Sequence, residues 1–293
     1  MESKQYLTFV IYGHDLTYYQ GARFGILSFL ANWHGKNRPQ VVVLTEETEH
    51  FDDLPILVIP ITSEQKNDWS LGNNYHFRIK NRGLKYISKY INLQPEDKLV
   101  FLDTDTYFTQ ATNIYFDSIT SKKALMYFPE VKINDLPESN EYAIIRNKNH
   151  LLADGSSYRV TDKSTMWASA VIGVTGSMIN SLDYADMLIT TLRENGCRAH
   201  TLEQYALSEA LSRDVELVAA KSWLNHYSTS GRKDWGRKVL QRFFAQYGQL
   251  SFEEQIERAK KVSFARPLSE VIRGHIYKKK KKLLALFKNT SSK

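Results

Sequence analysis

The stretch Asp97-Lys-Leu-Val-Phe-Leu-Asp-Thr-Asp-Thr-Tyr-Phe108 decides the fold that the sequence predicts. Its apolar run from Leu99 to Leu102 is typical of a buried strand, and two carboxylates, Asp103 and Asp105, follow directly. Side chains two positions apart in a strand point the same way, so both acids project where the strand leaves its sheet. Ligands of open α/β sheets collect at this edge, and paired carboxylates suit a divalent cation that also binds phosphate oxygens. A turn rich in Asp and Thr is the simpler alternative.

The residues before this stretch predict alternating strands and a helix. Apolar runs at 6–12, 40–45 and 54–61 are typical of strands, and Pro55 and Pro60 indicate that the third lies near an edge. Between the first two, apolar residues recur at helical spacing from Asp15, a capping residue, to Trp33. This alternation predicts an α/β domain with a mostly parallel sheet flanked by helices.

The residues after this stretch predict further strands and helices. Strands are expected at 124–128 and 166–174, and helices at 76–87, 177–193 and from Leu202 onward. A long polar connection at 129–165 is expected to cover the acceptor side of a cleft.

Two motifs resemble the glycosyltransferases of the GT-A fold, and most of all their family 8, which transfer sugars from nucleotide diphosphate donors. One is the Asp103-Thr-Asp105 strand. The other is His226, Gly231 and Lys233, which is similar to the His-x-x-Gly-x-x-Lys segment of that family with one residue inserted. The resemblance covers about residues 6–235. It implies a GT-A-like, Rossmann-type mixed sheet, which we expect to span residues 1–240, before a helical, basic extension at 241–293.

The resemblance implies a metal centre that holds the donor diphosphate. Asp103, Asp105 and His226 would bind Mn²⁺ or Mg²⁺, and two acids with one imidazole are a sensible ligand set for Mn²⁺. Gly231 would let the backbone approach the diphosphate, and Lys233 would neutralise it. The inserted residue makes Arg232 an alternative to Lys233.

Further donor contacts are expected around this centre. They comprise Thr104, the turn residues Tyr12, Asp15 and Tyr18 for the nucleobase, and Arg78, then Lys85, for the phosphates or sugar. Arginine matches phosphate oxygens with two parallel donors, which favours Arg78. The alternatives are tyrosines that pack on the core and a basic helix face that is merely solvated.

Glu203 and Gln204 are the candidate catalytic residues, because they resemble the Asp-Gln pair of the family. Family 8 retains configuration at the anomeric carbon, with a glutamine such as Gln204 beside the sugar. An inverting enzyme would instead use Glu203 as its base. Thr201-x-Glu-Gln also predicts a helix capping box. Ser169 and Ala170 depart from the family pattern, where an asparagine is usual.

Composition limits the class of protein. The chain has 293 residues, of which 42% are hydrophobic and 24% charged, as in ordinary globular proteins. A single cysteine excludes an intrachain disulfide, and the first apolar run is too short to cross a membrane, so we expect a cytoplasmic protein.

Much of the formal net charge of +7 lies near the C-terminus, where five consecutive lysines at 278–282 precede Leu-Leu-Ala-Leu-Phe287. Such a segment suits an anionic membrane surface, so residues 276–293 predict peripheral membrane contact rather than nucleic-acid binding. A tail without any partner is the alternative.

These observations together predict a metal-dependent glycosyltransferase. It would move a hexose from a UDP-sugar to a hydroxyl of a saccharide or glycolipid acceptor, in polysaccharide or lipopolysaccharide synthesis, with retention. Two other classes stay open: a nucleotide-sugar binding protein without turnover, and a membrane adaptor that keeps the fold but not the site.

Overall fold

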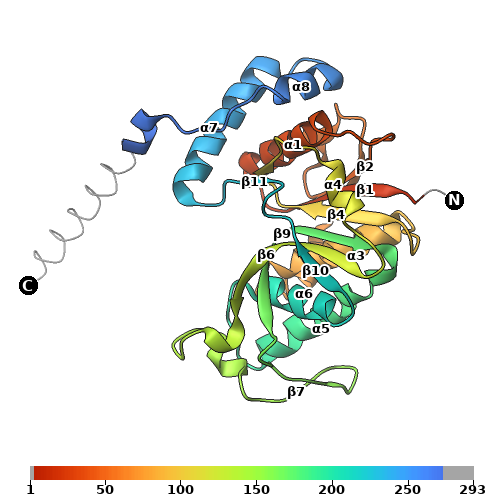
Figure 1. Ribbon diagram of the computed structural model, residues 1–293, viewed down its shortest axis with the longest axis vertical. Helices are drawn as coiled ribbons and strands as arrows, with labels where there is room; N and C mark the ends of the chain where they lie inside the picture. Colours follow the sequence, from red (N-terminus) through yellow and green to blue (C-terminus); the bar gives the residue numbers. More distant parts are fainter. Residues whose placement is uncertain (1–2, 273–293) are drawn as a thin grey trace, which may run out of the picture.

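The computed structural model describes residues 3–272, and a seven-stranded sheet lies at its centre with helices on both faces (Figure 1). The strands of this sheet lie in the order β10-β6-β9-β4-β1-β2-β3. Their bounds are β1 Gln5–Ile11, β2 Gln40–Thr45, β3 Leu57–Pro60, β4 Lys98–Leu102, β6 Lys123–Lys132, β9 Thr165–Thr175 and β10 Glu216–Ala219. The two small pairs are β5 Thr106–Tyr107 with β11 Asn225–His226, and β7 His150–Leu151 with β8 Ser157–Tyr158.

The helices connect these strands. They are α1 Leu16–Ala31, α2 Ser63–Trp69, α3 Arg78–Tyr90, α4 Asn113–Asp117, α5 Ser181–Glu194, α6 Leu202–Ser212, α7 Ser230–Tyr247 and α8 Phe252–Ala259. Short 3-10 turns lie at Thr48–Phe51, Ile133–Asp135, Ala143–Ile145 and Gly176–Met178.

Most neighbouring strands of the large sheet are parallel. β1 pairs in parallel with β2 and β4, β2 with β3, and β6 with β10, whereas β9 runs antiparallel to β4 and β6. The predicted α/β class and mostly parallel mixed sheet are therefore confirmed. The third predicted strand is shorter than expected and lies at the edge, as its prolines indicate.

Two apolar layers hold the helices against the sheet. One layer includes Ile79 of α3, Leu188 of α5 and Leu207 of α6 on one face, and the other includes Phe24 of α1 and Phe243 of α7 on the opposite face. Each of these five side chains is at most 3% exposed, so both faces of the sheet are covered. Burial on both faces explains why β1, β2 and β4 are continuous apolar runs.

The C-terminal helices differ from the predicted domain arrangement. Residue 240 lies inside α7, and Leu240, Phe243 and Ile256 belong to the same buried layer as α1. A boundary at 240 would therefore cut a helix that packs on the core. Residues 276–293, for which we expect membrane contact, lie outside the described residues. Among residues 3–272, no helix combines the length and apolar character needed to span a bilayer.

The connection at 129–165 contains more structure than expected. β6 continues to Lys132, and β7 and β8 form a hairpin near α5, far from α7 (Figure 1). Tyr142 and Tyr158 are buried against Tyr205 of α6. Several side chains of this segment thus join the core on the α5 and α6 face, although most of its residues are exposed, and its beginning, at Glu130, lies beside Gln204.

Candidate metal centre at the end of β4

The two acids of the motif lie at the carboxyl end of β4, as the sequence predicts. The Asp103 amide donates to the carbonyl of Ala170 on β9 at 2.9 Å, and the Thr106 hydroxyl donates to the Asp103 carbonyl at 2.7 Å. These bonds fix a tight turn between β4 and β5. β5 then pairs with β11, with Thr106 opposite His226, so a residue 121 positions away from Asp105 comes to its side.

Asp103, Asp105 and His226 form a compact group that could hold a metal ion. One ligating atom of each lies within 4.8 Å of those of the other two. His226 Nε2 is 2.9 Å from one Asp105 oxygen, and Lys233 Nζ is 3.1 Å from the other. Carboxylate oxygens with one imidazole nitrogen fit Mn²⁺ or Mg²⁺. The predicted ligand set is thus brought together.

Electrostatics shift the pKa values of the two acids in opposite directions. Burial alone would raise the pKa of Asp105, but His226 and Lys233 together lower it to about 2. Burial raises the pKa of Asp103 above its usual value, although the nearby Lys80 ammonium opposes this shift. The surroundings of Asp105 therefore favour its ionised form, whereas the ionised form of Asp103 is favoured mainly by the neighbouring Lys80 cation.

Lys80 of α3 supplies that cation, and the sequence analysis missed it. Its ammonium lies 3.4 Å from Asp103 and 3.4 Å from Glu203, and it donates to the Ser169 hydroxyl at 2.8 Å. Burial lowers the pKa of Lys80, but the two carboxylates more than offset this and raise it. Lys80 therefore joins the acid motif to the predicted catalytic pair. The one usable signal was its position on the basic helix that leads into β4.

Glu203 and Gln204 lie at the start of α6 in different surroundings. The Glu203 side chain is buried, the Ser169 hydroxyl donates to it at 3.3 Å, and burial raises its pKa. Gln204 is half-buried and its amide donates to Glu130 at 3.4 Å. The capping box is not formed, because the Thr201 hydroxyl pairs with the Tyr142 hydroxyl at 2.9 Å instead. The Ser169 hydroxyl accepts from Lys80 and donates to Glu203, so it links these two charged side chains.

A hollow of about 520 Å³ opens beside the acids. Tyr12, Tyr18, Thr104 and Lys233 line it together with Asp103, Asp105 and Lys80. Gly21 of α1 packs directly on the turn between β4 and β5, since a Cβ at Gly21 would lie 2.2 Å from the Thr104 carbonyl oxygen. Four of the donor-binding residues predicted from sequence, Tyr12, Tyr18, Thr104 and Lys233, therefore line the same hollow as Asp103 and Asp105.

The remaining predicted donor residues lie elsewhere. The buried Arg78 pairs through two nitrogens with Asp186 of α5 at 2.6 and 2.8 Å, and Lys85 pairs with Asp183 at 2.6 Å. These are ion pairs between α3 and α5 rather than members of the hollow. Their acidic partners are about a hundred residues away in sequence, so no local pattern could reveal them.

Asp15, Gly231 and Arg232 lie around the ends of α1 and α7. The Asp15 carboxylate accepts from the Thr17 amide as the N-cap of α1 and lies 3.4 Å from Arg237. Gly231 lies under Arg266, because a Cβ there would approach Arg266 Nη1 to 2.8 Å. Arg232 lines a second opening, together with Asn225 and His226 of β11.

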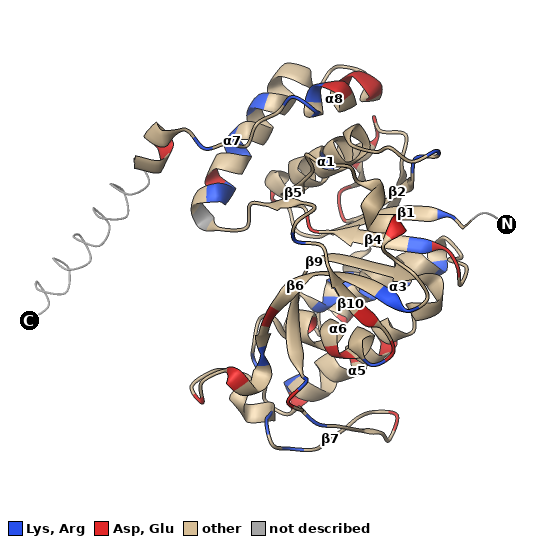
Figure 2. Cartoon of the chain, in the orientation of Figure 1, with Lys and Arg blue, Asp and Glu red and all other residues tan. Residues whose placement is uncertain are grey.

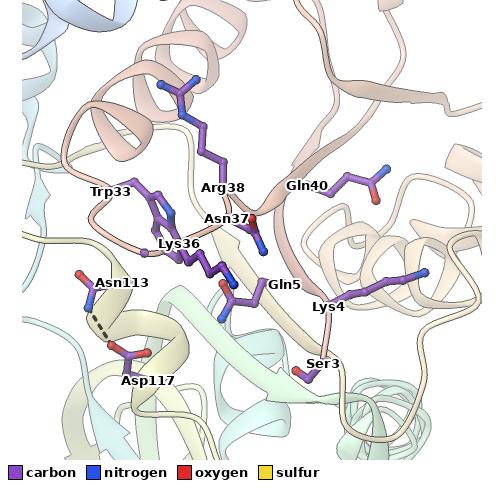
Figure 3. Close-up of a pocket in the computed structure, with 11 residues that line it drawn as sticks. Ser3, Lys4, Gln5, Trp33, Lys36, Asn37, Arg38, Gln40, Asn113 and Asp117 are labelled. Atoms are coloured by element: carbon purple, nitrogen blue, oxygen red, sulfur yellow. Dashed lines mark hydrogen bonds between the residues drawn. The ribbon is translucent and has the colours of Figure 1, made fainter. Parts of the chain in front are cut away.

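Two further features of the described residues share part of the character of a binding site. Glu47, Glu49 and His50 also bring ligating atoms within 4.8 Å of one another, but they lie on a surface turn. A polar hollow of about 500 Å³ at the opposite edge of the sheet contains Lys4, Trp33 and Lys36 (Figure 3). Its acid, Asp117, bonds to Asn113 at 2.7 Å and has no second acid beside it in the lining described. Neither feature matches the centre at β4.

No protein-family model matches the chain, and no curated protein is significantly similar to it. What the protein does is therefore inferred from its residues and their geometry.

Proposed function

We propose that the protein is a metal-dependent glycosyltransferase of the GT-A type that transfers a hexose from a UDP-sugar to a hydroxyl group. One observation carries the proposal: Asp103, Asp105 and His226 meet at the carboxyl end of a central strand, with Lys233 beside them. Ligands of open α/β sheets bind at this edge. An acid pair, an imidazole and a lysine there suit a diphosphate bound with Mn²⁺ or Mg²⁺.

In this proposal, some residues bind the metal ion, one balances charge and others bind the nucleobase. Asp103, Asp105 and His226 would hold the ion, which when bound would neutralise the charge that gathers on UDP as it leaves. Lys233 carries a second positive charge at the same place. Tyr12 and Tyr18, which line the hollow, offer rings on which the uracil base stacks.

In the transfer, the acceptor oxygen bonds to the anomeric carbon and the bond from that carbon to the UDP oxygen breaks. The bonding electron pair leaves with UDP, and the acceptor proton passes to a departing phosphate oxygen. Retention is favoured over inversion because Glu203 is buried and paired with Lys80 and Ser169, which leaves it badly placed as a base. Gln204, half-buried beside Glu130, is then the residue next to the sugar.

UDP release from a panel of UDP-sugars, with Mn²⁺ or with chelator, tests the proposal. We expect release from one donor, its loss with chelator, and its loss in Asp105→Asn, which keeps the shape of the side chain but removes its charge. Asp53→Asn is the matched control, because Asp53 pairs with Arg23 on the surface and is half exposed.

Calorimetry with UDP and Mn²⁺ separates the other classes. A nucleotide-sugar binding protein would bind UDP with metal yet release none from any donor. If the wild type neither binds UDP with Mn²⁺ nor releases it, the proposal is wrong and an adaptor role takes its place.

A further inference from the structure

A groove of about 780 Å³ lies between the β5–β11 pair and residues 262–266, which follow α8. It shares no lining residue with the hollow that holds the acid pair, but it includes His226, whose imidazole contacts Asp105. The two spaces therefore lie on either end of the contact between His226 and Asp105 at the candidate metal centre. A molecule in the groove would lie next to the place where the donor bond breaks.

The charged side chains that line this groove are basic. They are Lys221, Arg232 and Arg266. The part of the chain that the structure describes contributes no acidic residue to this lining. Lys221 lies over the Phe128 ring, with its ammonium 4.1 Å from the ring centre, and Arg266 donates to the Glu270 backbone carbonyl at 2.8 Å. Within residues 3–272, no carboxylate forms an ion pair with any of the three. Three cations that converge without a carboxylate favour an anionic ligand.

Aromatic rings form the remaining wall. Tyr107 stacks on Phe264 with ring centres 4.0 Å apart, and Tyr127 packs edge-on against His226 at 5.3 Å. Both tyrosines and Trp235 are half-buried, although the indole Nε1 of Trp235 is itself buried. Half-exposed rings with polar edges offer apolar faces to sugar C–H groups and donors to sugar hydroxyls.

We propose that this groove binds the acceptor, and that the acceptor is an anionic saccharide, a sugar unit that carries a phosphate or a carboxylate. The proposal rests on the transferase function, to which it adds the acceptor class. The rings hold the sugar, Lys221 and Arg266 hold the anionic group, and the position beside His226 directs a hydroxyl to the reacting centre.

Calorimetry on the full chain tests this, with and without saturating UDP and Mn²⁺. The probes are glucose 6-phosphate and glucuronate, which separate phosphate from carboxylate, with glucose and inorganic phosphate as references. We expect at least one anionic sugar to bind about tenfold more tightly than either reference. The double variant Lys221→Gln, Arg266→Gln should lose about that factor, while Lys221→Gln alone, at an exposed side chain, should lose part of it. Lys36→Gln, in the opposite hollow, is the matched control (Figure 3).

Several outcomes would overturn the inference. Equal binding of glucose would remove the role of charge, and equal binding of inorganic phosphate would remove the role of the rings. Unchanged affinity in both variants, or competition between the sugar phosphate and UDP, would place the ligand outside the groove. Affinity for UDP with Mn²⁺, measured on the same samples, should be unchanged in both variants. If the wild type showed no binding of UDP with Mn²⁺, that result would contradict the transferase function but not the proposed anion-binding groove.

Discussion

Lys80 shows how one side chain determines the state of several others. It is the cation that faces both Asp103 and Glu203, two carboxylates whose pKa is raised by burial although the Lys80 ammonium opposes the shift. In a poorly hydrated site, an ion pair adds little to the stability of the fold. Removal of one partner, however, leaves the other charge unpaired and strongly destabilises the fold. Lys80 therefore matters to folding as well as to the candidate site.

Replacement of Lys80 by methionine should destabilise the fold by about 3–5 kcal/mol at neutral pH, because the buried Glu203 and the partly exposed Asp103 would lose their cation. The loss should shrink as the pH falls and these carboxylates take up protons. Urea unfolding across this pH range measures both effects. Lys85→Met is the control, since Lys85 pairs with an exposed acid and should cost about 1 kcal/mol or less. A loss that did not depend on pH would contradict this explanation.

Glu209 on α6 predicts a second pH effect. Burial raises the pKa of its carboxyl group, although Tyr158 and Ser164 donate to it at 2.8 and 2.9 Å. A group whose pKa is raised on folding favours the folded state below its unfolded pKa of 4.5, and this contribution is lost as the pH rises through the folded value. Glu209→Gln should therefore gain stability relative to the wild type as the pH rises above about 4.5. A constant difference from pH 4 to pH 8, about the usual range for such titrations, would contradict it.

At the scale of elements, apolar runs predicted the strands, and a capping residue predicted the start of α1. The ion-pair partners of the charged residues on α3 could not be predicted. β2 and β4 follow from uninterrupted apolar residues, and α1 begins after Asp15 as its capping role requires. Arg78 and Lys80 lie two positions apart on one basic helix, yet Arg78 pairs with α5 and Lys80 with the acid motif. Which of them faces the site depends on how α3 packs, and that is a property of the tertiary structure.

The packing of α7 against α1 gives the prediction at this scale. Phe243 is 3% exposed and its ring meets Phe24 of α1 edge-on at 5.1 Å. Phe243→Ala should cost about 3–5 kcal/mol, whereas Phe244→Ala, on a half-buried neighbour, should cost clearly less. Thermal and urea unfolding would measure both. Equal small losses would mean that α7 is an appendage, as the boundary at 240 predicts.

At the scale of the whole molecule, charge divides the chain in two. Residues 3–272 contain 31 Lys and Arg and 31 Asp and Glu, whereas residues 273–293 contain eight Lys and Arg and no acid. Within the first part the charges are themselves uneven, because basic residues gather on α7 (Figure 2). The net positive charge of the protein thus belongs to its last residues, as the sequence analysis expected.

This division predicts that the chain binds anionic membranes through its end. Each lysine near such a surface contributes about 1 kcal/mol, so the full chain should sediment with vesicles that contain phosphatidylserine, and a chain ending at residue 272 should not. Binding should weaken as salt rises well above about 0.15 M, because screening shortens the reach of the charges. Neutral phosphatidylcholine vesicles are the control. If the shortened chain bound equally well, the basic side chains of α7 would carry the contact instead, and the surface beside the basic groove would face the membrane.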